Sequence, residues 1–128
     1  QKPIALGADI VMYSATKHID GQGRVLGGAI LGSKKFCEDI IKPFIKNTGP
    51  TISPFNAWIL VKSLETLELR IKQHNFNAIK VAEFLENNKN ITQTISPWLE
   101  SFNQSILSKK QMLGGGSIVS FYIKKNLP

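Results

Sequence analysis

Apolar and β-branched residues form two short runs in the first quarter of the chain, at residues 8–13 and 25–32. Each run has the length of a buried strand, and the second includes glycines at which two backbones can approach closely. The glycine-rich segment 20–23 between them favours a turn. The pattern therefore predicts a strand, a loop and a second strand, with polar residues where the first strand ends.

A helical pattern follows the second run. Ser33 is a typical N-cap residue, and apolar residues at helical spacing continue to about Lys46. Pro43 lies inside this stretch and is expected to bend or end the helix, because proline has no backbone N–H and its ring crowds the preceding turn.

Helical spacing then extends over an unusual length, from Ser53 to Asn88. Ser53 followed by Pro54 is a strong start signal, since it joins a capping side chain to a proline at the first helical position. Roughly 35 residues with a rise of 1.5 Å each would span about 50 Å, more than one small domain. We expect either one long helix or two joined helices over residues 53–88, connecting two domains.

The last third of the chain contains two further predicted strands, at residues 91–95 and 117–123. A Ser- and Lys-rich stretch and three consecutive glycines separate them. A sheet that stops at its second strand leaves an exposed edge and a half-built apolar face. We therefore expect the chain to be an internal piece of a longer protein, with both ends being cuts.

Composition narrows the classes of protein. With 128 residues, of which 42% are apolar, the chain is typical of a globular protein. Its net charge of +7 would suit an acidic partner, but the basic residues are scattered and lack the interleaved aromatic residues of a nucleic-acid surface. No apolar run approaches the roughly 20 residues needed to cross a bilayer. We expect neither a nucleic-acid partner nor a membrane partner.

Cysteine, histidine and tryptophan, which often form reactive, metal-binding or ligand-binding sites, are few in this chain. The single cysteine, Cys37, excludes an internal disulfide and favours a cytoplasmic protein. His18 and His74 lack the acidic neighbours of a metal site, so no metal is expected. Trp58 and Trp98 are assigned to packing, the usual role of aromatic residues on apolar faces.

The segment Ser14-Ala15-Thr16-Lys17 combines an amine nucleophile with two hydroxyl groups at the exit of the first predicted strand. If the backbone stays extended, alternation places Ser14 and Thr16 on one side, where their hydroxyl groups could hold a phosphate. A lysine near other cationic groups can lose its proton at physiological pH and act as a nucleophile. Taken alone this tetrapeptide is a weak signal, because a solvated lysine after a strand is far commoner.

Its surroundings resemble the lysine signature of the Cys/Met-metabolism family of pyridoxal-phosphate (PLP) enzymes. The residues that carry the resemblance are Gly7-Ala8-Asp9-Ile10-Val11, Ser14-Ala15-Thr16-Lys17, Asp20 to Gly28, Thr48 to Trp58, Leu64 to Arg70 and Gly115 to Phe121. Within the family, the loop from Asp20 to Arg24 is most similar to that of the O-succinylhomoserine sulfhydrylases. His18 departs from the tyrosine that usually follows the lysine, although an aromatic ring of similar reach is retained.

The resemblance implies an α/β fold, as a fragment of the type I PLP-dependent transferase (aspartate aminotransferase-like) fold. Residues 1–52 would be the C-terminal part of the large PLP-binding domain and residues 53–88 the long helix joining two domains. Residues 89–128 would begin the small C-terminal domain. The complete enzyme would be a homotetramer, a dimer of dimers, acting on a small amino-acid substrate.

The resemblance also implies the roles of the site residues. Lys17 would bind pyridoxal 5'-phosphate covalently and move protons during the reaction, while Ser14 and Thr16 hold the phosphate. The aspartate on the pyridinium nitrogen, the tyrosine that stacks on the ring and the arginine for the substrate carboxylate would lie outside the chain. We therefore expect the chain alone to be inactive.

The implied activity is a γ-replacement in methionine biosynthesis, in which O-succinylhomoserine reacts with sulfide to give homocysteine. Two alternatives stay open at this point. One is a cystathionine γ-synthase or cystathionine lyase of the same family, and the other is a non-catalytic interaction domain that binds an acidic partner.

Overall fold

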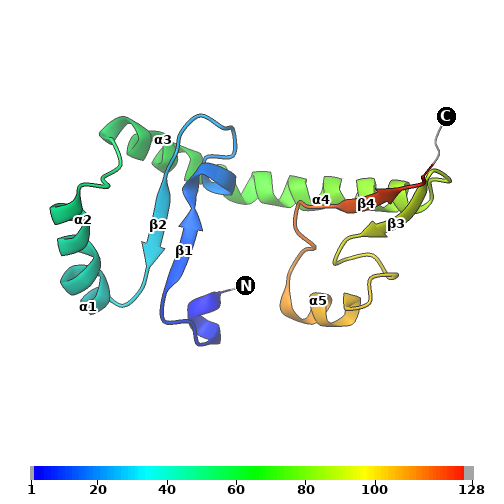
Figure 1. Cartoon of the computed structure of the whole chain (residues 1–128), viewed down its shortest axis with the longest axis horizontal. Coiled ribbons are helices and arrows are strands. Elements are labelled where there is room, and N and C mark those ends of the chain that lie inside the picture. Colours follow the sequence, from blue (N-terminus) through cyan, green and yellow to red (C-terminus); the bar gives the residue numbers. More distant parts are fainter. Residues whose placement is uncertain (1, 126–128) are drawn as a thin grey trace. The chain divides into compact units, whose positions relative to one another are not determined.

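The computed structural model describes residues 2–125, which divide into two compact units, residues 2–68 and residues 69–125. In Figure 1, the first unit contains the elements up to helix α3 (Pro54–Leu64), and the boundary between the units falls just inside helix α4 (Leu67–Glu86). Each unit combines helices with one two-stranded antiparallel sheet.

The first unit begins with a 3-10 turn, η1 (Pro3–Leu6), followed by strands β1 (Val11–Ser14) and β2 (Gly28–Leu31). The two strands pair antiparallel, with Val11 opposite Leu31 and Ser14 opposite Gly28. The predicted order of strand, loop and strand is therefore confirmed, although both strands are shorter than their apolar runs.

The expectation that these strands are buried is wrong for the described structure. Met12 is 81% exposed and Ile30 is 45% exposed. The reason is the small size of the sheet, because no third strand joins this pair within residues 2–125. Apolar residues on a two-stranded ribbon have few neighbours to cover them.

The helical segment after β2 consists of α1 (Lys34–Phe36), a π-helical turn η3 (Cys37–Ile41) and α2 (Lys42–Thr48). The Ser33 hydroxyl accepts a hydrogen bond of 3.1 Å from the Phe36 N–H, which confirms the predicted cap. Pro43 does not end the helix, which continues to Thr48. The π-helical turn η3, directly before α2, interrupts the regular α-helical pattern next to the position where Pro43 lacks an N–H. Gly49, with a φ of 81°, ends the helix instead.

Two helices occupy the long helical stretch. Helix α3 (Pro54–Leu64) begins at the Ser53 cap, whose hydroxyl accepts from the Asn56 N–H at 3.1 Å. Helix α4 (Leu67–Glu86) follows after a break at residues 65–66. Of the two expected arrangements, one long helix or two joined helices, the structure has the two joined helices.

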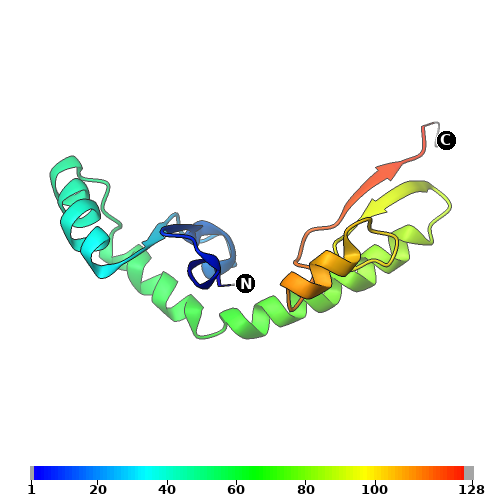
Figure 2. The same cartoon turned by 90° about the horizontal axis from the view of Figure 1, so that it is seen from below.

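The second unit contains most of α4, strand β3 (Ile91–Ile95), helix α5 (Ser105–Gln111) and strand β4 (Ser120–Ile123). Both strands lie side by side in Figure 1 and Figure 2 and pair antiparallel. The first strand has the predicted bounds, whereas the second starts three residues later than expected. Ala82 and Leu99 are buried in this unit.

The two tryptophans differ in their surroundings. Trp98 is half-buried, and its ring lies against Gly115 so closely that a Cβ there would collide with it. Trp58 is 59% exposed, and its one aromatic neighbour among residues 2–125 is Phe55, with ring centroids 6.0 Å apart. The assignment to packing is therefore wrong for Trp58 in the described structure, because this face of α3 is not covered by other described elements.

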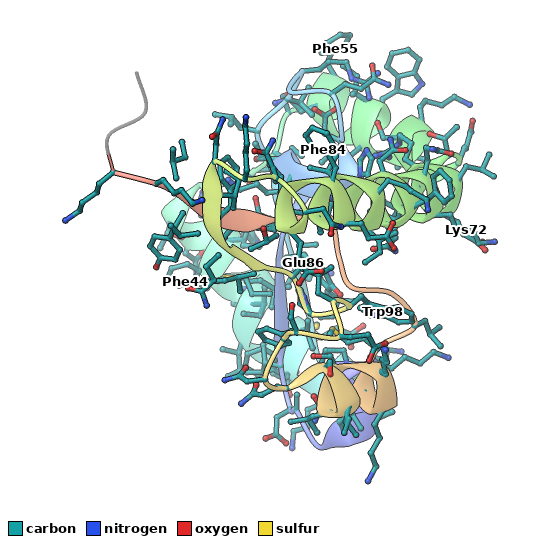
Figure 3. All side chains as sticks on the ribbon, turned by 90° about the vertical axis from the view of Figure 1, so that its right-hand side faces the viewer. Phe44, Phe55, Lys72, Phe84, Glu86 and Trp98 are labelled. Carbon is teal, nitrogen blue, oxygen red and sulfur yellow. The ribbon has the colours of Figure 1, made fainter. Side chains whose placement is uncertain are left out.

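Large apolar side chains on other helices are exposed as well. Phe44, Phe55 and Phe84 project from their helices in Figure 3 and are 59%, 64% and 68% exposed. None of the helices within the described residues is long and apolar enough to cross a membrane.

Candidate active site

The turn that carries Lys17 starts where β1 ends. Residues Ala15–Ile19 form a π-helical turn, η2, and Lys17 has φ −83° and ψ −112°, outside the helical region. The Gly21 N–H donates to the Lys17 carbonyl at 2.7 Å, and the Asp20 N–H donates to the Ala15 carbonyl at 2.9 Å. The backbone on both sides of Lys17 is therefore hydrogen-bonded, while its side chain is exposed.

The two candidate hydroxyl groups occupy different settings. The strict alternation that we expected stops at Ser14, because the turn begins at the next residue. The half-buried Thr16 Oγ1 accepts a 3.0 Å hydrogen bond from the Gly27 N–H and donates a longer one, of 3.3 Å, to the Gly27 carbonyl. The shorter bond fixes the oxygen, and the longer one leaves its hydrogen able to turn to another acceptor.

Gly27 itself lies against apolar side chains of this unit, where a Cβ has little room. A Cβ at this position would lie 2.8 Å from Cδ1 of Leu60 and 3.2 Å from Cδ1 of Ile52. Ala15 and Leu60 belong, with Val25, to the buried apolar core of this unit. The hydroxyl of Thr16 and the start of the Lys17 turn are therefore both held against the core.

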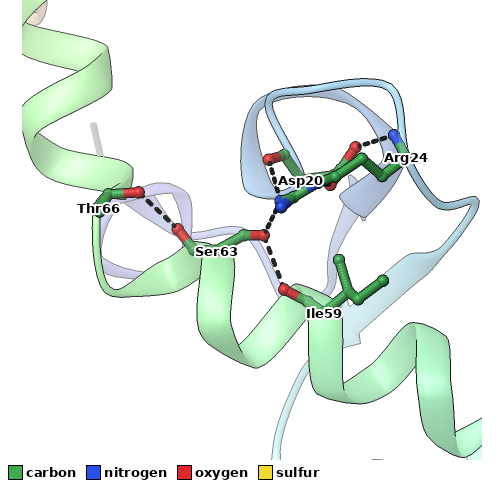
Figure 4. A network of polar contacts seen from close by, with 5 residues as sticks. All are labelled: Asp20, Arg24, Ile59, Ser63 and Thr66. Carbon is green, nitrogen blue, oxygen red and sulfur yellow. Dashed lines mark hydrogen bonds and ion pairs between the residues drawn. The ribbon is translucent and has the colours of Figure 1, made fainter.

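A polar network adjoins the same turn (Figure 4). Asp20 is fully buried, and its carboxylate accepts from the Arg24 N–H at 2.7 Å and from Arg24 Nε at 2.9 Å. Arg24 Nη2 donates to the Asp20 carbonyl at 3.3 Å and to Ser63 Oγ at 2.6 Å. Ser63 Oγ donates in turn to the Ile59 carbonyl at 2.7 Å, so the network reaches into α3.

The charge of Asp20 is stabilised by this arrangement. Burial by itself raises the pKa of the carboxyl group, but the hydrogen bonds and the positive charge of Arg24 outweigh that effect and hold the pKa of Asp20 below its usual value. A buried carboxylate without such a partner would be strongly destabilising. Asp20 therefore stays ionised at neutral pH.

Sequence reasoning used Asp20 and Arg24 only as marks of a family loop and missed their structural role. Two local signals were available: opposite charges spaced four residues apart, and glycines at positions 21 and 23. Both glycines have positive φ, 70° and 67°, which lets the loop turn back on itself. The contact of Arg24 with Ser63 on α3 could not be predicted, because nothing in the sequence distinguishes Ser63 from other serines in helices.

The donor set suits PLP. Within residues 2–125, the side chains of Ser14 and Lys17 make no hydrogen bond or ion pair with another described residue, so a hydroxyl group and an ammonium group remain available. Thr16 adds a hydroxyl group whose hydrogen can be redirected. Hydroxyl donors for a phosphate and an amine for an aldehyde are the groups that PLP requires.

No group of three or more His, Cys, Asp and Glu side chains that could hold a metal ion occurs among the described residues.

Comparison with known proteins identifies the family. Residues 1–127 match the family model described as Cys/Met metabolism PLP-dependent enzyme. The chain is 48% identical over 94% of its length to an O-succinylhomoserine sulfhydrylase of Mycobacterium tuberculosis and covers 30% of that protein. It is 41% identical over 99% of its length to an L-methionine gamma-lyase of Treponema denticola and covers 32% of that protein.

A solved structure agrees. The crystal structure of cystathionine gamma synthase from Xanthomonas oryzae matches 98% of this chain with a TM-score of 0.91 and 33% identity, and the chain covers 32% of that protein. The chain belongs to the Cys/Met-metabolism family of PLP-dependent enzymes, and it spans about a third of the length of these relatives. The predicted family, the type I fold class and the PLP cofactor are thereby confirmed.

Proposed function

We propose that this chain is part of an enzyme that replaces the γ-substituent of O-succinylhomoserine with sulfide and releases homocysteine. The observation that carries the proposal is the position of Lys17, an exposed amine on a hydrogen-bonded turn directly after Ser14 and Thr16. In a family of PLP-dependent enzymes, this is the residue we assign to the cofactor.

The roles of the side chains follow from their chemistry. Ser14 and Thr16 bind the phosphate through their hydroxyl groups, and Lys17 holds the cofactor covalently. PLP, when bound, supplies the electron sink for the reaction. Lys17, once released as a free amine, removes a proton first from Cα and then from Cβ of the substrate. Succinate leaves from Cγ with the electrons of the C–O bond, and hydrosulfide forms the new C–S bond at Cγ. Lys17 then returns the protons to Cβ and Cα, and homocysteine is released.

Because the chain spans about a third of the length of its relatives, we propose that the rest of the enzyme lies in parts of the protein outside this chain. We assign residues 1–52 to the end of the large PLP-binding domain, residues 53–88 to the helical connection and residues 89–128 to the start of the small domain. The boundary between the compact units after Glu68, inside the helical connection, supports this division. The complete enzyme is proposed to be a cytoplasmic homotetramer, and the chain alone is proposed to be inactive.

The sulfhydrylase activity is supported by the loop from Asp20 to Arg24 and by the similarity to the Mycobacterium tuberculosis protein of that name. A cystathionine γ-synthase or a lyase is the second candidate, favoured by the similarity to the Xanthomonas and Treponema proteins. The fold does not discriminate between them, since they differ in the transition state that the pocket binds best.

Competing substrates separate the candidates. The purified full-length enzyme is supplied with O-succinylhomoserine plus sulfide, O-acetylhomoserine plus sulfide, O-succinylhomoserine plus cysteine, or cystathionine or methionine alone. We expect the highest kcat/KM for O-succinylhomoserine plus sulfide. If another reaction exceeds it by more than about tenfold, roughly 1.4 kcal/mol of transition-state binding, the sulfhydrylase assignment is wrong. A full-length protein that binds PLP but turns over none of these substrates contradicts the enzyme proposal.

A further inference from the structure

We propose that Asp20, Arg24 and Ser63 form a clamp that positions Lys17 for covalent attachment to PLP. The inference deepens the proposed function and rests on the assignment of Lys17 to the cofactor. None of the three is a catalytic residue in this account, because each would act on PLP only through the backbone of the Lys17 turn.

The clamp is connected to Lys17 through the backbone of the turn. Asp20 lies three residues after Lys17, and its N–H closes the turn by donating to Ala15 at 2.9 Å. The next N–H, of Gly21, donates to the Lys17 carbonyl at 2.7 Å. Whatever fixes Asp20 therefore also fixes the backbone from which the Lys17 side chain projects.

The hydrogen bonds from Arg24 fix the carboxylate of Asp20. A fully buried aspartate accepts from both the backbone and the guanidinium of Arg24, as Figure 4 shows. The guanidinium is planar and rigid, so its contacts fix the orientation of the carboxylate as well as its distance. A lysine could keep the charge and the backbone N–H at this position, but it lacks the planar fork that donates from Nε to Asp20 and from Nη2 to Ser63.

Ser63 anchors the clamp on α3. Arg24 Nη2 lies 2.6 Å from Ser63 Oγ, and Ser63 is 5% exposed. The Ser63 hydroxyl is itself oriented because it donates its hydrogen to the Ile59 carbonyl. The oxygen is thus left as an acceptor for Arg24, and the loop is attached to a helix rather than to another loop.

The alternative is that the network only stabilises the fold. In that case, its loss would lower the melting temperature without changing how Lys17 reacts with bound PLP. A clamp instead changes the ratio of covalently attached PLP to PLP that is bound through its phosphate alone. This ratio is accessible by borohydride reduction, which makes the covalent bond permanent.

The experiment uses the full-length protein, saturated with PLP, and the variants S63A, R24K and R24M. The control is K62Q, which removes an exposed ion pair between Lys62 and Glu65 of 2.5 Å, next to Ser63 on the same helix. Total bound PLP, the fraction fixed on the Lys17 peptide by borohydride, and the melting temperature of the apoprotein are measured for each protein.

We expect S63A to lower the ratio of covalent to non-covalent PLP about fivefold, the equivalent of one hydrogen bond of roughly 1 kcal/mol. R24M should lower it about tenfold or more, because a charge-assisted contact is lost and Asp20 is left without its partner. R24K should lie between R24M and the wild type, and K62Q should match the wild type.

The outcomes are distinguishable. If borohydride fixes PLP on Lys17 and the ratio is unchanged in S63A and R24M, the clamp inference is wrong and the proposed function stands. A lower melting temperature with an unchanged ratio leads to the same conclusion. If R24M does not fold, S63A decides, since alanine is well tolerated in a helix. If PLP in the wild type is fixed on another lysine, both the inference and the assignment of Lys17 are overturned.

Discussion

Arg24 and Ser63, 39 positions apart in the sequence, are joined by a hydrogen bond of 2.6 Å from Nη2 to Oγ. The bond links the loop that follows the Lys17 turn to the last turn of α3. Because Arg24 also neutralises the buried Asp20, one side chain serves both the electrostatics and the geometry of this loop.

Acidification should weaken this loop. The pKa of Asp20 lies below its ordinary value of 3.8, so ionised Asp20 stabilises the folded state above that pH. This contribution is lost as the pH falls through the pKa of the folded state. We expect the wild-type apoprotein to melt at a higher temperature than D20N. This difference should have its full size near about pH 6 and shrink below about pH 4. A difference that stays unchanged from about pH 6 to well below about pH 4 would contradict a carboxylate held by Arg24.

A side chain at Gly27 should force the buried Leu60 side chain to shift. A Cβ there would lie 2.8 Å from Leu60 Cδ1, so G27A should destabilise the full-length protein by about 1–3 kcal/mol, the usual cost of overpacking. Gly28 is the matched control, because a Cβ there would meet only the Tyr13 carbonyl, at 3.5 Å. Denaturant unfolding measures both variants, and equal losses for G27A and G28A would disprove the steric account.

The two hydroxyl groups should behave differently when removed. Replacing Ser14 and Thr16 together with alanine should weaken PLP affinity about thirtyfold, as expected for two hydrogen bonds of roughly 1 kcal/mol each. T16A should also lower the melting temperature of the apoprotein, because it removes the contact with Gly27. S14A should not, and T16S should preserve both properties. Unchanged PLP affinity in the double variant would exclude these residues from phosphate binding.

The 128-residue chain alone should lack a cooperative thermal transition. Its exposed apolar side chains include Met12, Phe55 and Phe84, which are 81%, 64% and 68% exposed. Exposed apolar surface of this kind favours association or a molten state. Calorimetry and light scattering test this directly, and a sharp transition in a monodisperse monomer would be the opposite result.

Local signals in the sequence were sufficient for much of the fold. The caps at Ser33 and Ser53 appear where their side chains predict them, because a cap depends only on the next three residues. A break within residues 53–88 was one of the two expected arrangements, but its position at residues 65–66 could not be foreseen, since neither glycine nor proline is present there. Burial was overestimated at Met12 and Trp58, because an apolar pattern indicates which face is to be covered but not whether the described elements cover it.

For the candidate site, the sequence predicted the residue types and the structure added their connections. The lysine and the two hydroxyl residues were singled out by one short motif together with the resemblance of its surroundings to the family. The contact of Thr16 with Gly27 and that of Arg24 with Ser63 depend on how the chain folds back, and spacing alone contains no information about either.

The central claim is that Lys17 holds the cofactor, and mapping the borohydride-reduced peptide in the full-length protein tests it most directly. The account predicts that PLP is found on Lys17, that K17A loses both the visible absorbance and the modified peptide, and that K34A keeps both, since Lys34 is an exposed residue of α1 with a side chain 86% accessible. Modification of a different lysine in the wild type, or visible absorbance retained in K17A, would contradict it.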